Sequence, residues 1–355
     1  MGCILLPTSE GSRNRRGALA IAAALLVLAS LAGCTSAPRK AGPATPSSGG
    51  SPTDISATAP ASPIPVPTGR PLAPALAAAP HFLLFLGGSL ADLAVTRIEG
   101  QDVDASAPRA VMTGAPEGAG ESVFAPALSP DRKKVAYVQG APGHLLTFGG
   151  EGAIVVQNVD GTGARVVAPL GTSGAPAWSP DGRQIAFLQR DALWLMDADG
   201  SNPHSLSLGL PVNTRIAWSP DGKKLAVGTG SPSRIAIVDL ASLAYSYIGP
   251  ASAQQDHPAW SPDGRQLVYA MGGANALFVA NADGSEARQI TTCIHPECSR
   301  DLEPAWSPDG AYIAFVRYAP GSKQGAAQQV YVVPAAGGDA RQITNGAEGH
   351  AFPSW

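Results

Sequence analysis

Charged and aromatic residues are scarce in this sequence. Asp, Glu, Lys and Arg together make up 14% of the 355 residues, aromatic residues make up 6%, and the formal net charge is −3. A chain with so little charge and a slight negative excess does not attract nucleic acid or anionic lipid headgroups. Gly (41) and Pro (33) are abundant instead. This composition is typical of a chain with many turns between short strands.

The sequence also lacks the motifs of common enzymes. No serine lies in the Gly-x-Ser-x-Gly surroundings of a nucleophile elbow, and there is no His-Glu-x-x-His, phosphate-binding loop or dinucleotide fingerprint. We therefore predict no catalytic residue and no cofactor.

Residues 1–33 have the pattern of a secretory signal. A basic patch at 13–16 precedes an apolar run at 18–29 that is too short to cross a membrane comfortably. The following Leu-Ala-Gly-Cys at 31–34 resembles the lipobox of bacterial lipoproteins. The resemblance implies cleavage before Cys34 and lipidation of its thiol, and acyl chains on one residue hold a protein to a bilayer. An ordinary secretory signal with an incidental Cys34 is the alternative.

Residues 34–80 are dominated by Ala, Pro, Ser, Thr and Gly, with large apolar residues too sparse to build a core. We predict a disordered tether that holds the folded part away from the membrane.

An anchor phrase recurs five times in the rest of the chain, residues 81–355. It reads Pro-Ala-Trp-Ser-Pro-Asp-Gly, and only Leu128, Arg132 and Ile216 depart from it. The phrases begin at Pro126, Pro176, Ile216, Pro258 and Pro304. Their Leu or Trp residues are 40 to 50 residues apart, which is the period of a four-stranded propeller blade.

Each repeat unit predicts four strands. The anchor phrase supplies the first strand and then a turn, because Pro presets φ, Asp accepts hydrogen bonds from backbone amides and Gly adopts positive φ. Runs such as 184–188 and 192–196 supply the second and third strands, and runs such as 288–291 supply the fourth. The Asp-Ala-Asp-Gly phrase at 197–200 predicts a hairpin turn, because a calcium loop of the EF-hand type would need a distal Glu that is absent.

These phrases resemble the TolB-type β-propeller repeat over residues 81–355. The resemblance implies an all-β fold, and nothing before residue 81 looks like the separate amino-terminal domain that TolB itself carries. Residues 81–113 have strand-like runs but no anchor phrase before them, and 352–355 look like an anchor strand without its turn. We therefore predict six blades, with a C-terminal strand that closes the ring and removes exposed sheet edges. Five blades or an open ring is the alternative.

One anchor tryptophan at the same place in each blade indicates packing between blades rather than an aromatic ligand cage.

Two cysteines, Cys293 and Cys298, are close together in a connection between blades. In an oxidising envelope we expect them to form a disulfide. The alternative is a zinc site that uses Cys293, His295 and Cys298, with Asp301 or Glu303.

Charged residues stand just before several anchor strands, where the chain enters the ring on one face. This candidate binding rim consists of Arg215, Asp256, His257, Asp301, Glu303 and His350. A solvated loop edge is the competing interpretation, although loops on a rigid scaffold often carry function.

We expect a non-catalytic, lipid-anchored, extracytoplasmic protein of the bacterial cell envelope that binds an envelope protein, a peptide or a glycan. One alternative is an enzyme at the centre of the ring, such as a quinone-dependent dehydrogenase or a lyase, in which the rim supplies acid and base groups. Another is an assembly or sensory subunit of an envelope complex.

Overall fold

The computed structural model describes residues 82–88, 96–102, 109–112, 123–140, 152–172, 176–190, 192–250, 252, 254–294, 298–320, 328–345 and 349–355. All of them belong to one compact unit, Ala61–Trp355. The predicted signal peptide, Cys34 and most of the predicted tether lie in the other unit, and none of these segments is among the described residues. Within the described ranges, no helix has the length and apolar character needed to span a membrane.

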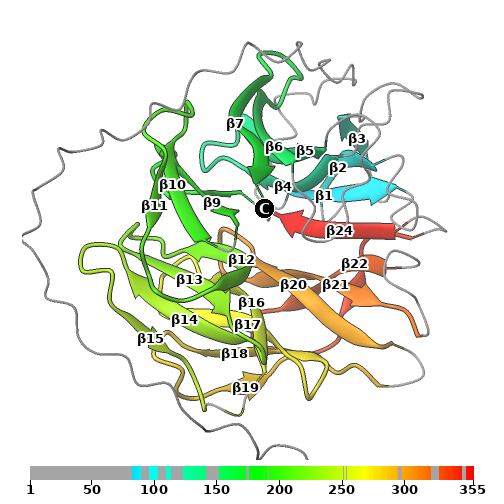
Figure 1. The fold of residues 1–355 in the computed structure, drawn as a ribbon. Helices are drawn as coiled ribbons and strands as arrows, with labels where there is room; N and C mark the ends of the chain where they lie inside the picture. Colours follow the sequence, from blue (N-terminus) through cyan, green and yellow to red (C-terminus); the bar gives the residue numbers. More distant parts are fainter. Residues whose placement is uncertain are drawn as a thin grey trace, which may run out of the picture. The chain divides into compact units, whose positions relative to one another are not determined.

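The described strands form six antiparallel blades of four strands each, which Figure 1 shows around a common centre. Four blades are separate sheets, and blades 2 and 3 are joined into one eight-stranded sheet by the pairing of Thr172 with Gln189. Blade 1 contains β24 (Gly349–Ser354), β1 (Phe82–Gly88), β2 (Thr96–Asp102) and β3 (Arg109–Met112). Blade 2 contains β4 (Val123–Leu128), β5 (Lys134–Gly140), β6 (Gly152–Asn158) and β7 (Arg165–Thr172). Blade 3 contains β8 (Ala177–Trp178), β9 (Gln184–Gln189), β10 (Ala192–Asp197) and β11 (His204–Leu206).

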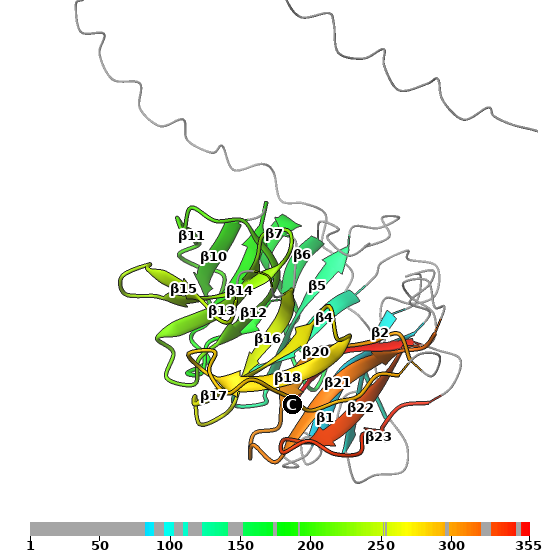
Figure 2. The ribbon, with the colours of Figure 1, turned by 90° about the horizontal axis from the view of Figure 1, so that it is seen from below.

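The other three blades follow the same order from the innermost to the outermost strand. Blade 4 contains β12 (Val212–Trp218), β13 (Lys224–Thr229), β14 (Arg234–Asp239) and β15 (Tyr245–Tyr247). Blade 5 contains β16 (Gln255–Trp260), β17 (Gln266–Met271), β18 (Ala276–Asn281) and β19 (Arg288–Gln289). Blade 6 contains β20 (Arg300–Trp306), β21 (Tyr312–Tyr318), β22 (Gln328–Pro334) and β23 (Arg341–Gln342). Figure 2 shows the blades from below.

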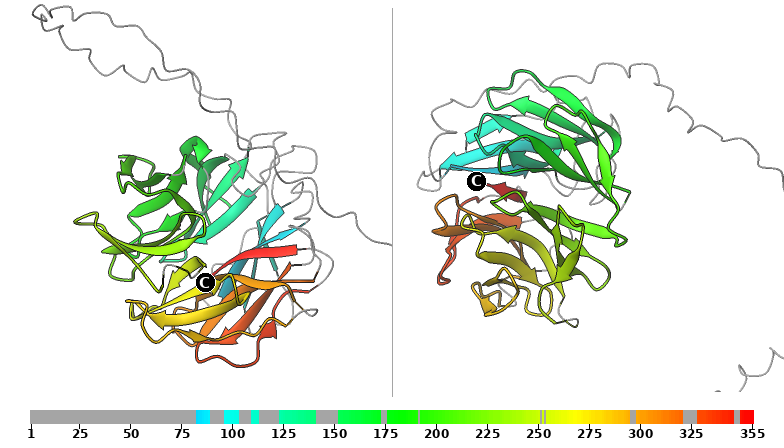
Figure 3. Two further views of the ribbon diagram at one scale, coloured as in Figure 1. Left: turned by 60° about the horizontal axis from the view of Figure 1, so that its bottom comes forward. Right: turned by 90° about the vertical axis from the view of Figure 1, so that its left-hand side faces the viewer.

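The C-terminal strand closes the ring. β24 pairs with β1 in antiparallel register, with Leu86 opposite Ala351 and Leu84 opposite Ser354. The red β24 lies beside the cyan β1 in Figures 1 and 3. The prediction of six blades with a C-terminal closing strand is confirmed, and the five-blade alternative is wrong.

The four Ser-Pro-Asp-Gly phrases and the Ser-Pro-Asp-Arg phrase at 129–132 form turns with the same hydrogen bonds after the innermost strands. In each turn the Ser Oγ donates to the Asp Oδ1 at 2.6–2.7 Å, and the backbone N–H five residues after the Ser donates to its Oγ at 2.9 Å. The serines are Ser129, Ser179, Ser219, Ser261 and Ser307. We call the side of the propeller that carries these turns the turn face.

The anchor tryptophans pack between blades, as their single place in each repeat indicates. Trp178 and Trp260 are buried. The indole Nε1 atoms of Trp178 and Trp218 donate to the carbonyls of Ala127 and Ala177 in the preceding blade, both at 3.1 Å. The apolar core therefore consists of layers between neighbouring blades.

A bulge interrupts the innermost strands three residues before the anchor Leu or Trp. Ala125, His257, Glu303 and Phe352 occupy this position with φ between +49° and +57°. Arg215 holds the equivalent position in β12, inside a register shift between β12 and β13. A bulge re-aims side chains, and here it turns one side chain from each of these blades toward the centre. We call the side of the propeller where the innermost strands begin the connection face.

Candidate functional site

Side chains from three blades meet at the centre of the connection face. Arg215 lies on blade 4, His257 on blade 5 and Glu303 on blade 6, all at the bulge position. The Arg215 Nη2 atom is 3.4 Å from the Glu303 Oε2 atom. Blades 4 and 6 are not neighbours in the ring, so this contact occurs at the propeller axis. We call Arg215, His257 and Glu303 the central triad.

Glu303 is the most enclosed member of the central triad, with 1% of its surface exposed. Its Oε2 atom accepts a hydrogen bond from the Phe352 backbone N–H at 2.7 Å. Burial raises the pKa of Glu303, and the charge of Arg215 and the Phe352 hydrogen bond oppose that shift. Burial also lowers the pKa of the Arg215 guanidinium, although Glu303 opposes this effect. The two groups therefore depend on each other for their charged forms.

His257 is held neutral beside these charges. Burial, followed by the positive charges of Arg215 and Arg300, lowers the pKa of His257 to about 3. Its Nδ1 atom is buried and has no hydrogen-bond partner among the described residues. The Nε atom of Arg215 is in the same condition. Buried polar atoms are normally hydrogen-bonded, and two of the nine buried side-chain atoms without partners in the described part of the chain lie in this one cluster.

Aromatic rings that sequence reasoning did not assign to the site surround the central triad. The Arg215 guanidinium lies 4.8 Å from the centre of the Phe352 ring, and Phe352 packs edge-on against Phe124 at 4.4 Å. Arg300 lies over the Tyr318 ring at 4.7 Å. The alignment of the repeats contained one signal for Phe352, since it stands three residues before Trp355 as Glu303 stands before Trp306.

The other three residues of the predicted rim make contacts of their own. Asp301 forms a two-point ion pair with Arg317, with both N–O distances 2.8 Å. The Asp256 Oδ1 atom accepts a hydrogen bond from Ser233 at 2.7 Å. The structure thus brings Arg215, His257 and Glu303 together, while these two carboxylates are occupied beside them.

His350 is buried in blade 1. Its Nε2 atom is 3.5 Å from the Glu99 Oε2 atom, and its Nδ1 atom is 3.1 Å from the Gln329 Oε1 atom. Its ring also packs edge-on against Phe85 at 5.6 Å. These contacts join blade 1 to blade 6. They give His350 a structural role in packing between the two blades.

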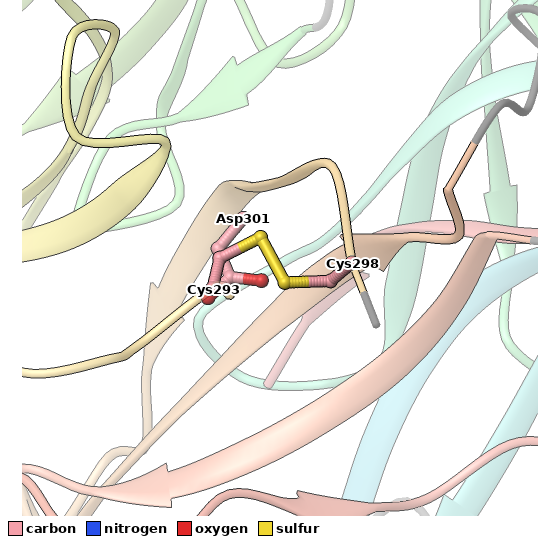
Figure 4. A group of neighbouring side chains, drawn as sticks. All are labelled: Cys293, Cys298 and Asp301. Atoms are coloured by element: carbon pink, nitrogen blue, oxygen red, sulfur yellow. A yellow bond between two sulfur atoms is a disulfide. The ribbon is translucent and has the colours of Figure 1, made fainter. Parts of the chain in front are cut away.

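Cys293 and Cys298 form a disulfide in the connection between blades 5 and 6, close to Asp301 (Figure 4). The three side chains lie near enough to one another to suggest metal ligands. However, cysteine binds zinc as a thiolate, and disulfide sulfurs are not thiolates. The Asp301 carboxylate is also bound by Arg317. The disulfide closes a small loop between Cys293 and Cys298, which we call the stapled loop. His295, the third residue of the zinc alternative, lies outside the described residues.

Three solved structures with a fold similar to this chain have low sequence identity to it. TolB from Acinetobacter baumannii is 18% identical with a TM-score of 0.64, and the match covers 78% of this chain and 66% of that one, just under two thirds. A putative TolB from Agrobacterium tumefaciens is 19% identical with a TM-score of 0.55 and coverages of 75% and 90%. A chain of the nidogen/laminin complex is 13% identical with a TM-score of 0.56 and coverages of 77% and 97%. At these identities the likeness concerns the fold alone.

The six blades of four strands each and these likenesses define a six-bladed β-propeller built from a tandem repeat. The family model of the TolB beta propeller domain matches residues 94–229 and 189–355, so the chain belongs to that family. No curated protein matches the chain significantly.

Proposed function

We propose that this protein is a lipid-anchored, non-catalytic binding protein of the bacterial cell envelope, and that the central triad on its connection face receives an envelope protein or peptide. The observation that carries the proposal is the pair of buried polar atoms, Arg215 Nε and His257 Nδ1, that have no partner among the described residues and lie at the axis of the ring. A partner segment that carries both hydrogen-bond acceptors and donors forms hydrogen bonds with these two atoms.

The chemistry of the central triad favours binding over catalysis. A general base or acid works best with a pKa near the working pH, whereas the pKa of His257 is lowered to about 3. Glu303 is held by Arg215 and by a backbone N–H. His257 is therefore arranged to form hydrogen bonds without changing its protonation.

The lipid anchor is the second part of the proposal and rests on the Leu-Ala-Gly-Cys sequence that ends at Cys34. Lipidation at Cys34 and the tether of 34–80 keep the propeller at a membrane surface outside the cytoplasm. Changing Cys34 to Ser is expected to release the protein from the membrane fraction, as measured by fractionation of cells and by mass spectrometry of the N-terminal peptide. An unlipidated N-terminal peptide in the wild-type protein would remove this part of the proposal.

The test of the binding role is an in-cell cross-linking pull-down of the tagged full chain. It compares wild-type protein with a variant that carries Arg215→Ala, His257→Ala and Glu303→Ala together. Removing Arg215 and Glu303 in one variant avoids leaving either charge buried alone. Thermal unfolding of the purified variant checks that the propeller still folds.

A matched control changes three charged residues of the turn face, Lys223, Lys224 and Arg265, to Ala. We expect one dominant envelope partner with wild-type protein and with the control, and its loss with the triad variant. A partner retained by a folded triad variant would place binding elsewhere. No partner at all, together with a cofactor that purifies with the wild-type protein, would favour an enzyme.

A further inference from the structure

Arg300 adds a second arginine to the connection face, beside the central triad. It begins β20, the strand that carries Glu303, and it is exposed. After burial, the charges of Arg215 and Arg300 lower the pKa of His257. Burial raises the pKa of Glu303, and both arginine charges oppose that rise. Arg300 and the central triad therefore form one electrostatic cluster at the axis.

The Arg300 side chain is held by a ring and by no acidic group. Arg300 stands opposite Tyr318 in the register of β20 and β21, and its guanidinium lies over the buried Tyr318 ring at 4.7 Å. A cation over an aromatic face is attracted to it. Among the described residues, the Arg300 side chain forms no ion pair and no hydrogen bond. The ring thus fixes the place of a flexible side chain while its charge stays available to a group from outside the chain.

The unsatisfied polar groups of this cluster are mainly donors. An arginine side chain has N–H donors and no acceptor, so the Arg215 Nε atom and the Arg300 guanidinium both need an acceptor. The His257 Nδ1 atom, also without a partner in the described part of the chain, donates in one tautomer of the neutral ring. The Glu303 Oε2 atom already accepts from Arg215 and from the Phe352 N–H. The cluster therefore calls for acceptor atoms.

Positive charge is also in excess in the cluster. The two arginines carry two positive charges, against at most one negative charge from Glu303. His257 adds no charge, because its pKa is about 3. Two neighbouring carboxylates, those of Asp256 and Asp301, are occupied by hydrogen bonds of their own. An anionic group that has only acceptors fits both the donors and the charge.

We propose that the connection face selects a carboxylate of its partner, which binds Arg300 and, beside it, Arg215. This inference rests on the proposed function, because a carboxylate is the anionic group that an ordinary protein or peptide supplies. Its two oxygens accept N–H bonds from both guanidinium groups at once. Arg215 keeps 19% of its side-chain surface exposed, so the carboxylate can reach it. A peptide offers this group in an Asp or Glu side chain or at its C-terminus, and the experiment separates these two sources.

The test captures peptides from a soluble library of random synthetic sequences with free C-termini on the immobilised full chain. Mass spectrometry identifies the captured peptides. Wild-type protein is compared with the triad variant described above and with Arg300→Gln, which removes one charge from an exposed side chain and is therefore expected to fold. Arg265→Gln is the matched control, because Arg265 is an exposed arginine of the turn face.

Peptides that wild-type protein captures and the triad variant does not are then synthesised in two altered forms. One form has a C-terminal amide, and the other has Asn or Gln in place of Asp or Glu. Calorimetry measures the affinity of each form. We expect one of the two changes to weaken binding to wild-type protein about tenfold, and that change identifies the source of the carboxylate. Arg300→Gln is expected to weaken the unaltered peptide by the same factor and to make the change without effect, whereas Arg265→Gln should behave as wild type.

The possible failures are distinguishable. Triad-dependent peptides that tolerate both changes, or that bind Arg300→Gln as tightly as wild type, would overturn this inference and leave the proposed function in place. The absence of any triad-dependent peptide would count against both.

Discussion

The two faces of this propeller use the same repeat in different ways. On the turn face, five turns repeat one hydrogen-bond pattern with nearly identical distances. On the connection face, the equivalent bulge positions hold five different residues: Ala125, Arg215, His257, Glu303 and Phe352. A turn must satisfy its own backbone, so every blade needs the same side chains there. A bulge side chain faces the axis, where each blade contributes its own chemistry.

The largest effect is expected from breaking the charge pair of the connection face. Changing Glu303 to Ala leaves the Arg215 guanidinium and the Phe352 N–H without their acceptor. We expect a loss of about 3 to 5 kcal/mol in the free energy of unfolding, measured by urea denaturation. The double variant Arg215→Met and Glu303→Leu removes both charges and is expected to lose less than Glu303→Ala alone. A double variant less stable than either single variant would contradict the pairing.

The second effect concerns pH. The pKa of His257 is about 3 in the folded chain, against 6.5 for an ordinary histidine. Below pH 6.5 the unfolded chain therefore binds a proton that the folded chain does not, and stability falls as the pH decreases toward 3. We expect a loss of about 2 kcal/mol between pH 6.5 and 4.5 that His257→Gln does not show.

Thermal unfolding across this pH range measures the difference between the two proteins. Glu303 has a raised pKa and contributes the opposite slope, but it is present in both. Parallel pH profiles for wild type and His257→Gln would show that His257 titrates normally.

A smaller effect is expected at the stapled loop of the connection face. The disulfide joins residues five apart in sequence, and a loop of this size stabilises the fold by at most about 2 kcal/mol in the chain-entropy treatment. Changing Cys293 and Cys298 to Ser is expected to lower the unfolding free energy by that amount or less. Dithiothreitol should reproduce the loss in wild-type protein and leave the variant unchanged. A variant that still responds to the reductant would contradict this explanation.

The smallest effects are expected on the turn face, and they should be equal. Ser179→Ala, Ser219→Ala and Ser261→Ala each remove a hydroxyl that donates to Asp and accepts a backbone N–H. Each is expected to cost about 1 kcal/mol, with the three values within about 0.5 kcal/mol in urea denaturation. Widely different losses would show that the turns are not equivalent units and would weaken the contrast between the faces.

The fold was predictable from the sequence because the same strand and turn pattern recurs in each repeat unit. The anchor phrases fixed the innermost strands and the first turns, and the incomplete units at 81–113 and 352–355 predicted the pairing of β1 with β24. Strand-like runs such as 184–188 and 192–196 correspond to β9 and β10. Local turn chemistry and a fixed period are enough for this level of prediction.

The candidate site was less predictable because a bulge cannot be recognised from spacing alone. Side chains alternate along a regular strand, and one extra residue reverses which of them face the axis. Sequence reasoning therefore grouped Asp256 with His257 and Asp301 with Glu303. In the structure His257 and Glu303 sit at the bulge, while Asp256 and Asp301 bind Ser233 and Arg317. Phe352 was not predicted as a site residue, because residues 352–355 were interpreted only as the strand that closes the ring.

The pairing of β24 with β1 also sets an order of events during synthesis. Among the strands that the structure describes, β1 is made first and β24, its partner on the axial side, is made last. Until then β1 presents an unpaired edge, and such edges pair readily with strands of other chains. Contacts between residues so distant in sequence form slowly. A chain whose synthesis is unfinished therefore presents the β1 edge, and a second copy of the chain can pair its own β24 with that edge.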